Sequence, residues 1–218
     1  KFISLTHKPD GWMGKTWACH NGAEAAEGTL LLFLDADVRL GTNGVKRLVQ
    51  TYARKGHTIS VQPYHDTKNW YEQGSLLFNL IQIAANGTAL PRPSGVGLYG
   101  PVILISKEDY IKIDGHAGVR DCIVEDMALG RRLCEAGLPF SLFVGDPEIS
   151  FRMYPDGFRS LFQGWVKNIA AGAMNTPPLL FCMVFLWIAS MASAPFHLLR
   201  FAFSGSIPLL AFSLPLYV

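Results

Sequence analysis

Apolar runs alternate with helical patterns along the first 150 positions of the chain. Residues 29–34 (TLLLFL) are apolar on both faces, which is typical of a central, fully buried strand. Further strands are predicted at 2–5 (FISL), 58–62 (TISVQ) and 101–105 (PVILI). Helical patterns cover about 15–27, 43–55, 68–85 and 124–136, the first ended by Gly28 and the last by Gly137. This alternation predicts an α/β fold with a mostly parallel sheet and helices on both faces.

Local signals refine this plan at two loops. Ser106 begins the run Ser-Lys-Glu-Asp, which has the form of a helix-capping box. The stretch PRPSGVGLYG (91–100) is dense in glycine and proline and reads as a loop. In open α/β sheets ligands bind beyond the carboxyl ends of the strands, and Asp35 and Asp37 stand at such an end.

The segment 155–172 has a different character. Its apolar residues recur at helical spacing in one stripe: Phe158, Leu161, Phe162, Trp165 and Ile169. Bases such as Arg159 and Lys167 lie elsewhere on the same helix, which suits a helix lying in a membrane interface. A helix that packs its stripe on the domain core is the alternative.

The last fifty residues are markedly apolar. Residues 179–196 and 201–218 contain no charged side chain, and Arg200 is the only formal charge after Lys167. A membrane span needs about 20 mostly apolar residues, so both runs are predicted as transmembrane helices, the second continuing past residue 218. A pair of buried core helices is the alternative. The bases ahead of the first run favour a cell-membrane protein with its catalytic domain on the cytosolic face.

Composition excludes several classes of protein. The chain has 218 residues, 50% hydrophobic, with a net charge of +2, so nothing in the charge points to nucleic acid. None of the four cysteines forms a CxxC pair, which argues against a zinc site. The chain opens without methionine on an apolar run, and we expect it to be a fragment that lacks part of the first domain.

GWMGKT (11–16) invites comparison with the phosphate-binding P-loop. That motif needs a glycine five positions before the glycine that precedes the lysine, and Pro9 stands there. ATPase chemistry is therefore disfavoured. The acids after the central strand then have another explanation. Asp35 and Asp37, two residues apart, could both reach one hard cation, Mg²⁺ or Mn²⁺, that bridges a diphosphate. An ordinary surface turn is the alternative.

A second acidic pair, Glu125-Asp126, begins a helical run. Carboxylates at a helix start are stabilised by the helix dipole, which needs no functional explanation. The functional interpretation makes Asp126 a general base that takes a proton from an acceptor hydroxyl, with Glu125 supporting the site. If the acceptor is a carboxylic acid, already ionised, Asp126 would mainly position it.

These motifs, in this order, resemble glycosyltransferase family 2, and in particular a membrane-bound subgroup that glycosylates carotenoid carboxylic acids. The stretches that carry the resemblance are PDGWMGKTWACHNGAEAAEG, TLLLFLDADV, CIVEDMALGRRL and MYPDGFRSLFQGWVKN. The resemblance implies a GT-A fold whose first strand is missing here. It divides the chain into a catalytic domain (1–154), an interfacial amphipathic helix (155–177) and transmembrane helices at 179–196 and 201–218.

The resemblance also implies roles for single residues. Asp35 and Asp37 would bind the metal and, with Gly14 and Lys15, the donor. Asp126 would be the catalytic base, with Glu125 beside it. His116, Arg120, Gln163 and Trp165 are weaker candidates for the acceptor side. The pattern QxxRW, which processive members carry, is absent because Gln163 is followed by Gly-Trp-Val-Lys; a polysaccharide synthase is therefore disfavoured.

The implied reaction is the metal-dependent, inverting transfer of a hexose, with glucose as the expected sugar, from a UDP-sugar. The expected acceptor is lipid-like, such as a carotenoid carboxylic acid, and the lipid bilayer is an expected partner. A hopanoid, sterol or glycerolipid acceptor is the nearest alternative. An alternative of another class is a non-catalytic membrane scaffold that keeps a GT-A-like domain.

Overall fold

The structure is a computed structural model that describes residues 2–85, 97–175 and 178–204. The chain divides into two compact units, residues 1–175 and 176–218. The first unit contains the sheets and the helices that surround them, together with the helix that begins at Phe158. The described part of the second unit is one long helix.

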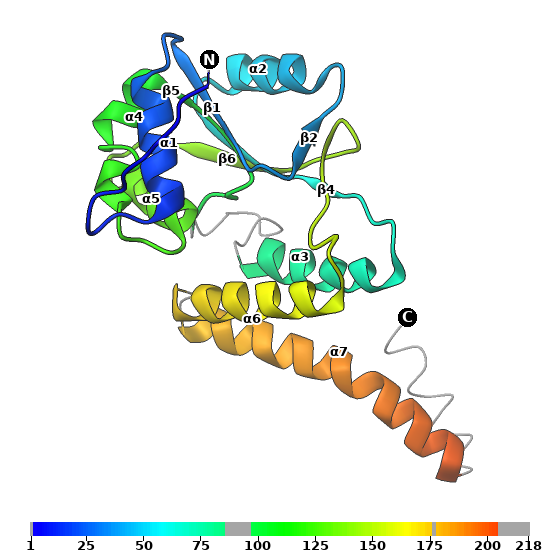
Figure 1. The fold of residues 1–218 in the computed structure, drawn as a ribbon. Coiled ribbons are helices and arrows are strands. Elements are labelled where there is room, and N and C mark those ends of the chain that lie inside the picture. The colour runs from blue at the N-terminus through cyan, green and yellow to red at the C-terminus, as the bar shows by residue number, and fades with distance from the viewer. Residues whose placement is uncertain (1, 86–96, 176–177, 205–218) are drawn as a thin grey trace. The chain divides into compact units, whose positions relative to one another are not determined.

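The main sheet of the first unit is mixed. Its order is β1 (Leu30–Leu34), β5 (Val102–Ser106), β3 (Thr58–Gln62) and β6 (Phe140–Val144). Figure 1 labels β1, β5 and β6 of this sheet. β5 runs antiparallel to both its neighbours, whereas β3 and β6 are parallel. β1, β3 and β6 therefore run in one direction and β5 runs against them, so the sheet is mixed and the prediction of a mostly parallel sheet holds only in part. Val102 pairs with Leu34, so β5 starts at the edge where β1 ends and runs back against it.

A second, small sheet adjoins this edge. It has the order β2 (Val38–Leu40), β7 (Ile149–Phe151) and β4 (Tyr64–His65). β2 follows directly after Asp35 and Asp37, and its pairing with β7 fixes the path of the chain beyond these acids. These short strands gave no clear signal in the sequence, because two or three residues are too few to show a period.

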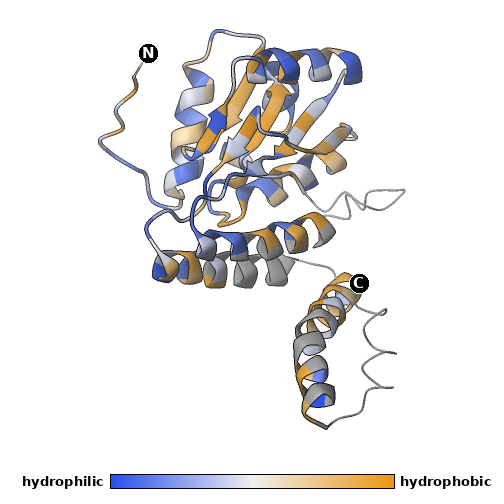
Figure 2. Cartoon of the chain, turned by 90° about the vertical axis from the view of Figure 1, so that its right-hand side faces the viewer, coloured by the Kyte–Doolittle hydropathy of each residue, from blue (hydrophilic) through white to orange (hydrophobic). Residues whose placement is uncertain are grey.

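Helices cover both faces of the main sheet, as predicted. α1 (Gly14–Glu24), α4 (Lys107–Lys112) and α5 (Glu125–Glu135) lie on one face, and α2 (Gly44–Lys55) lies on the other (Figure 1). Alternate strand residues divide between the two cores: Ile103 packs toward α1, α4 and α5, whereas Leu104 packs toward α2. Figure 2 shows the apolar strands enclosed between helices with polar outer faces.

Three local predictions have clear outcomes. The strand at 2–5 was wrong: residues 2–9 join neither sheet, and Phe2 is 92% exposed. The helix predicted at 68–85 is a 3₁₀ turn, η1 (Trp70–Gln73), followed by α3 (Gly74–Ala85). The capping box is confirmed, because the Ser106 hydroxyl accepts a hydrogen bond of 2.9 Å from the Asp109 amide. Most of the predicted loop at 91–100 lies outside the described residues.

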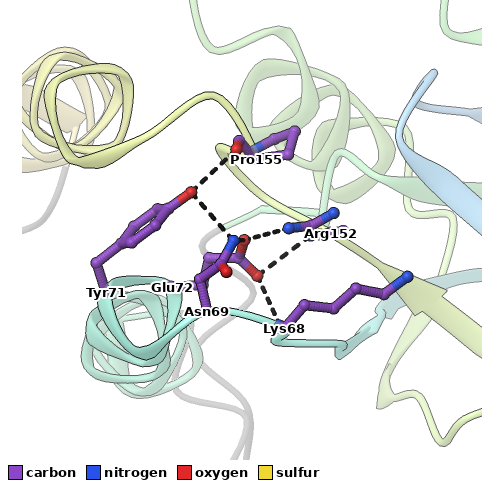
Figure 3. Close-up of polar contacts among 6 residues, drawn as sticks. All are labelled: Lys68, Asn69, Tyr71, Glu72, Arg152 and Pro155. Carbon is purple, nitrogen blue, oxygen red and sulfur yellow. Dashed lines mark hydrogen bonds and ion pairs between the residues drawn. The ribbon is translucent and has the colours of Figure 1, made fainter.

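A buried ion pair fixes the segment before α6 (Phe158–Asn175) against η1. The Glu72 carboxylate is fully buried and accepts hydrogen bonds from Arg152 Nη2 at 2.5 Å and from the Lys68 amide at 2.8 Å. Nearby, the Tyr71 hydroxyl donates to the carbonyl of Pro155 at 2.9 Å (Figure 3). Arg152, more than any other group, lowers the pKa of Glu72 to about 2.

The predicted helix at 155–172 is confirmed, but its apolar stripe is divided. Leu161 is 1% exposed and packs inward, and the Trp165 ring lies against Gly74 of α3. Phe158 and Phe162 are 61% and 56% exposed. Part of the stripe therefore belongs to the domain core, and part of it forms an apolar surface.

The transmembrane prediction for 179–196 is not borne out. These residues form part of α7 (Pro178–Ser204), which continues through His197 and Arg200. Among the helices of the described ranges, none is long and apolar enough to cross a membrane. The second predicted span, 201–218, lies outside the described residues from 205 onward.

Candidate functional site

The first acidic pair lies on a tight turn that joins β1 to β2. The Asp35 amide donates to the carbonyl of Pro101 at 2.9 Å, and the Val38 amide donates to the carbonyl of Asp35 at 3.1 Å. Asp35 is therefore held at the edge where β5 begins. Asp37 as a residue is exposed, but its carboxyl is partly shielded from solvent by neighbouring groups. This partial desolvation, and after it the charge of Asp35, raises the pKa of Asp37.

Lys15 lies in the first turn of α1 and points at two carboxylates. Its Nζ atom is 2.7 Å from Asp35 Oδ1 and 2.7 Å from Glu125 Oε1. Burial by itself would lower the pKa of Lys15, but Glu125 and then Asp35 outweigh it and raise this pKa above its ordinary value. The lysine therefore stays a cation and joins the end of β1 to the start of α5.

Backbone contacts hold α1 in this position. The carbonyl of Arg120 accepts hydrogen bonds from the Met13 amide at 2.7 Å and from the Thr16 hydroxyl at 2.8 Å. Thr16, the last residue of GWMGKT, is completely buried. It serves the fold by tying the helix start to the loop before α5. A Cβ atom at Gly14 would meet no heavy atom within 4 Å, so the space in front of that residue is open.

The second acidic pair begins α5, as predicted. Glu125 is 7% exposed and its carboxylate is held by Lys15. Asp126 is half-buried, and its Oδ1 atom accepts a hydrogen bond of 2.9 Å from the Met127 amide. Burial, and after it the charge of Glu125, raises the pKa of Asp126 to about 6. A carboxylate with this pKa is mostly ionised at neutral pH and is more basic than an ordinary aspartate.

Asp126 also lies beside the start of β5. A Cβ atom added to Gly100 would stand 2.7 Å from Asp126 Oδ2, so only glycine fits there without displacing the carboxylate. The Leu98 amide donates to the Asp126 carbonyl at 3.3 Å. The segment 97–100 therefore lines the side of Asp126 that faces the sheet.

The weaker candidates for the acceptor side take no part in the contacts of Lys15 with Asp35 and Glu125. His116 is 2% exposed, and its Nδ1 atom forms a hydrogen bond of 2.9 Å with the Tyr110 hydroxyl. Burial, then Lys15 and His20, lower the pKa of His116 to about 4, which suits a neutral core histidine. Arg120 is exposed, and its backbone carbonyl takes part in the site by accepting the hydrogen bonds that hold the start of α1. Gln163 is exposed on α6 and Trp165 packs on Gly74.

One residue of the quoted MYPDGF stretch was missed as a site candidate. Tyr154 has φ = 54°, and its ring occupies the space that a Cβ at Gly164 would need. Burial and the nearby charge of Asp37 raise the pKa of Tyr154. Tyr154, whose ring packs on α6, is therefore near enough to Asp37 for their charges to interact. The motif was visible in the sequence, but nothing local indicated that it folds back toward Asp37.

Asp35 and Asp37 could supply two ligands to a metal ion. In the part of the chain that the structure describes, no cluster of three or more His, Cys, Asp or Glu side chains could hold a metal ion. Asp35 and Asp37 supply hard oxygen ligands, which suit Mg²⁺ or Mn²⁺. Mg²⁺ is commonly held by one or two carboxylates together with substrate phosphates. The residues present therefore fit a metal that binds together with a phosphorylated donor.

A mixed sheet between two helix layers, with a lysine–acid cluster at one edge, defines a GT-A-like α/β domain. The profile of Glycosyl transferase family 2 matches residues 1–113, and the chain belongs to this family. The resemblance inferred from the motifs is thereby confirmed.

Curated relatives extend the match over most of the chain. The 4,4'-diaponeurosporenoate glycosyltransferase of Staphylococcus haemolyticus (strain JCSC1435) is 35% identical over 196 residues, which are 86% of this chain and 52% of that protein. The enzyme of the same name from Staphylococcus aureus (strain MRSA252) is 37% identical over 199 residues, 88% of this chain and 53% of its own length. The chain thus spans about half the length of these relatives.

Proposed function

We propose that this chain carries the catalytic centre of a glycosyltransferase that moves a hexose, glucose, from a UDP-sugar to a lipid-like acceptor. The observation that carries the proposal is the contact of Lys15 with both Asp35 and Glu125, directly beside Asp126. This contact brings a cation, one proposed metal ligand (Asp35) and the neighbour of the proposed base (Glu125) together at one sheet edge. The names of the relatives favour a carotenoid carboxylic acid as the acceptor.

In the proposed reaction an acceptor oxygen bonds to the anomeric carbon of the sugar as the bond from that carbon to UDP breaks. The configuration inverts and UDP leaves with the bonding electron pair. A divalent cation bound at Asp35 and Asp37 would supply charge neutralisation for the diphosphate. Lys15 would add a fixed positive charge beside it, and the open space at Gly14 leaves room for phosphate oxygens.

Asp126 serves the acceptor. An alcohol must lose its proton during the attack, and the Asp126 carboxylate would take it, since a pKa of about 6 suits a base near neutral pH. A carboxylic acid acceptor is already ionised, and Asp126 would then orient it. Glu125 holds Lys15, and its charge adds to the larger effect of burial in raising the pKa of Asp126.

The proposal is tested by UDP release from the full-length protein in membranes with Mn²⁺ or Mg²⁺. Asp37→Ala and Asp126→Asn should each lower turnover about 100-fold or more. Asp10→Asn, an exposed acid outside the site, is the matched control. If both site variants keep wild-type turnover, the residue assignment is wrong. A wild-type protein without UDP release and without metal-dependent nucleotide binding would instead be a scaffold.

We also propose that the domain works at the cytosolic face of the cell membrane, where an apolar acceptor is available. Phe158, Phe162 and Val166 recur one turn apart on α6 and form an apolar ridge in which all three side chains are more than half exposed. This exposure supports contact with lipid. Flotation with anionic phospholipid vesicles tests this. Phe162→Asp combined with Val166→Asp should lower the vesicle-bound fraction, whereas Gln163→Asp on the same helix should not. Equal binding of all three proteins would refute a lipid role for this ridge.

A further inference from the structure

Four of the described side chains of α3 show the reverse of the usual burial pattern. Its polar residues Ser75 and Asn79 are 0% and 5% exposed, whereas Leu76 and Leu80 are 56% and 42% exposed. Helices of folded proteins normally bury the apolar side chains and expose the polar ones. Burial of the polar face therefore needs a specific partner.

The partner within the fold is Gln62, the last residue of β3. Gln62 is 2% exposed, and its Nε2 atom donates to Asn79 Oδ1 at 3.2 Å. Ser75 lies one turn before Asn79, so its side chain is on the same face of α3. Gln62 Oε1 and Ser75 Oγ are buried without a hydrogen-bond partner among the described residues. Buried polar atoms are normally paired, so these two have unused bonding capacity.

Gln62, Ser75 and Asn79 form a buried polar cluster, and a third unpaired polar atom lies beside it. Trp165 of α6 packs its ring against Gly74, the residue before Ser75, and its Nε1 atom is buried without a partner in the described structure. The tryptophan as a whole is partly exposed. It therefore forms the boundary between the polar cluster and the apolar ridge of α6.

The cluster lies at the same sheet edge as the candidate site. Val102 pairs with Leu34 on one side and with Val61 on the other, so Asp35 and Gln62 flank the start of β5. Two strand spacings separate them, which is about 10 Å. Ile59 and Val61 pack toward α2, so Gln62 is directed to the opposite face of the sheet.

Asp126 stands between these two positions, because its carboxylate lies against Gly100 at the start of β5. In an inverting displacement the acceptor approaches the anomeric carbon from the side opposite the leaving group. If the diphosphate is held at Asp35 and the sugar extends over the start of β5 toward Asp126, that side would face Gln62 and α3.

We propose that Gln62, Ser75 and Asn79 form the subsite for the oxygen-bearing head group of the acceptor, a carboxylate or a hydroxyl, with Trp165 at its entrance. This inference rests on the proposed function. The Ser75 hydroxyl can donate to either head group, and the Gln62 and Asn79 amides can present donors or acceptors by rotation. The apolar remainder of the acceptor would leave the subsite past Trp165 toward the exposed side chains of α6.

The test compares acceptor and donor kinetics of the full-length protein in membranes. The acceptors are 4,4'-diaponeurosporenoate and the corresponding primary alcohol, with a UDP-sugar as donor. Ser75→Ala should raise KM for both acceptors roughly tenfold, with little change in KM for the donor. Gln62→Glu should raise KM more for the carboxylate than for the alcohol, because the new carboxylate repels only the former. Gln50→Glu, which adds the same charge on the exposed face of α2, is the matched control.

The outcomes separate this inference from the proposed function. Ser75→Ala removes an unpaired hydroxyl, so it should not lower the melting temperature, and a purely structural role would show no change in acceptor KM. An active protein whose acceptor KM is unaltered in both variants overturns the subsite. A rise in donor KM equal to that for the acceptor also overturns it. A wild-type protein that uses neither acceptor overturns the proposed acceptor, and the subsite with it.

Discussion

Replacing Asp126 by asparagine should stabilise the protein at neutral pH. Burial and the charge of Glu125 raise the pKa of Asp126 from the ordinary value of 3.8 to about 6. The folded protein thus holds this proton at pH values where the unfolded chain has lost it, so stability falls as pH rises through this window. A shift of about two units corresponds to roughly 3 kcal/mol at most, and the partial exposure of Asp126 reduces this to about 1–2 kcal/mol.

The assay is urea unfolding of the full chain at a series of pH values from about 4 to 7. The variant should gain stability over the wild type progressively as pH rises, because asparagine carries no charge to bury. Asp10→Asn controls for the loss of one exposed acid. If the difference in free energy of unfolding between wild type and Asp126→Asn is the same at every pH in this range, the raised pKa of Asp126 is refuted.

Four further predictions address the site and its framework. In the active protein, kcat/KM with an alcohol acceptor should fall below about pH 6, and Asp126→Asn should abolish this limb along with most activity; an unchanged limb would assign it to another group. Lys15→Met should weaken UDP binding with Mn²⁺ at least about tenfold in calorimetry, and unaltered affinity would exclude a donor role. Gly130→Ala places a Cβ atom 2.6 Å from a backbone Cα and should cost about 1–3 kcal/mol in thermal unfolding, whereas Gly22→Ala meets nothing within 4 Å; equal stability would contradict the packing. Glu72→Gln should lower the melting temperature because it leaves a buried arginine contact without its charge partner, and an unchanged value would show that the pair is dispensable.

The site was partly predictable because its acids follow strong local signals. The central strand before Asp35 is apolar on both faces, and the turn after it begins where that run ends. Glu125 and Asp126 begin a helix whose pattern is equally clear. Which of these residues touch was not predictable. No local pattern indicated that Lys15 would bridge Asp35 and Glu125, or that the Thr16 hydroxyl would donate to a carbonyl 104 residues away.

The errors share one cause, the dependence of pairing on distant parts of the chain. The strand predicted at 2–5 has suitable residues but no neighbouring strand in the described structure. The predicted direction of β5 was wrong, because the alternation of strands and helices does not specify from which edge a strand enters the sheet. Gln62 went unnoticed because a glutamine at the end of a strand looks like an exposed residue until α3 is placed over it.

By itself, the sequence determined the elements with clear periodicity, the positions of the acidic pairs and the family, because these depend on neighbouring residues and on short motifs. Tertiary structure alone decided the mixed sheet, the Lys15 bridge and the buried polar face of α3. It also decided the Glu72–Arg152 pair, whose partners are 80 residues apart. Such contacts form only when separate elements pack, and their burial changes the chemistry of side chains that would otherwise be ordinary surface groups.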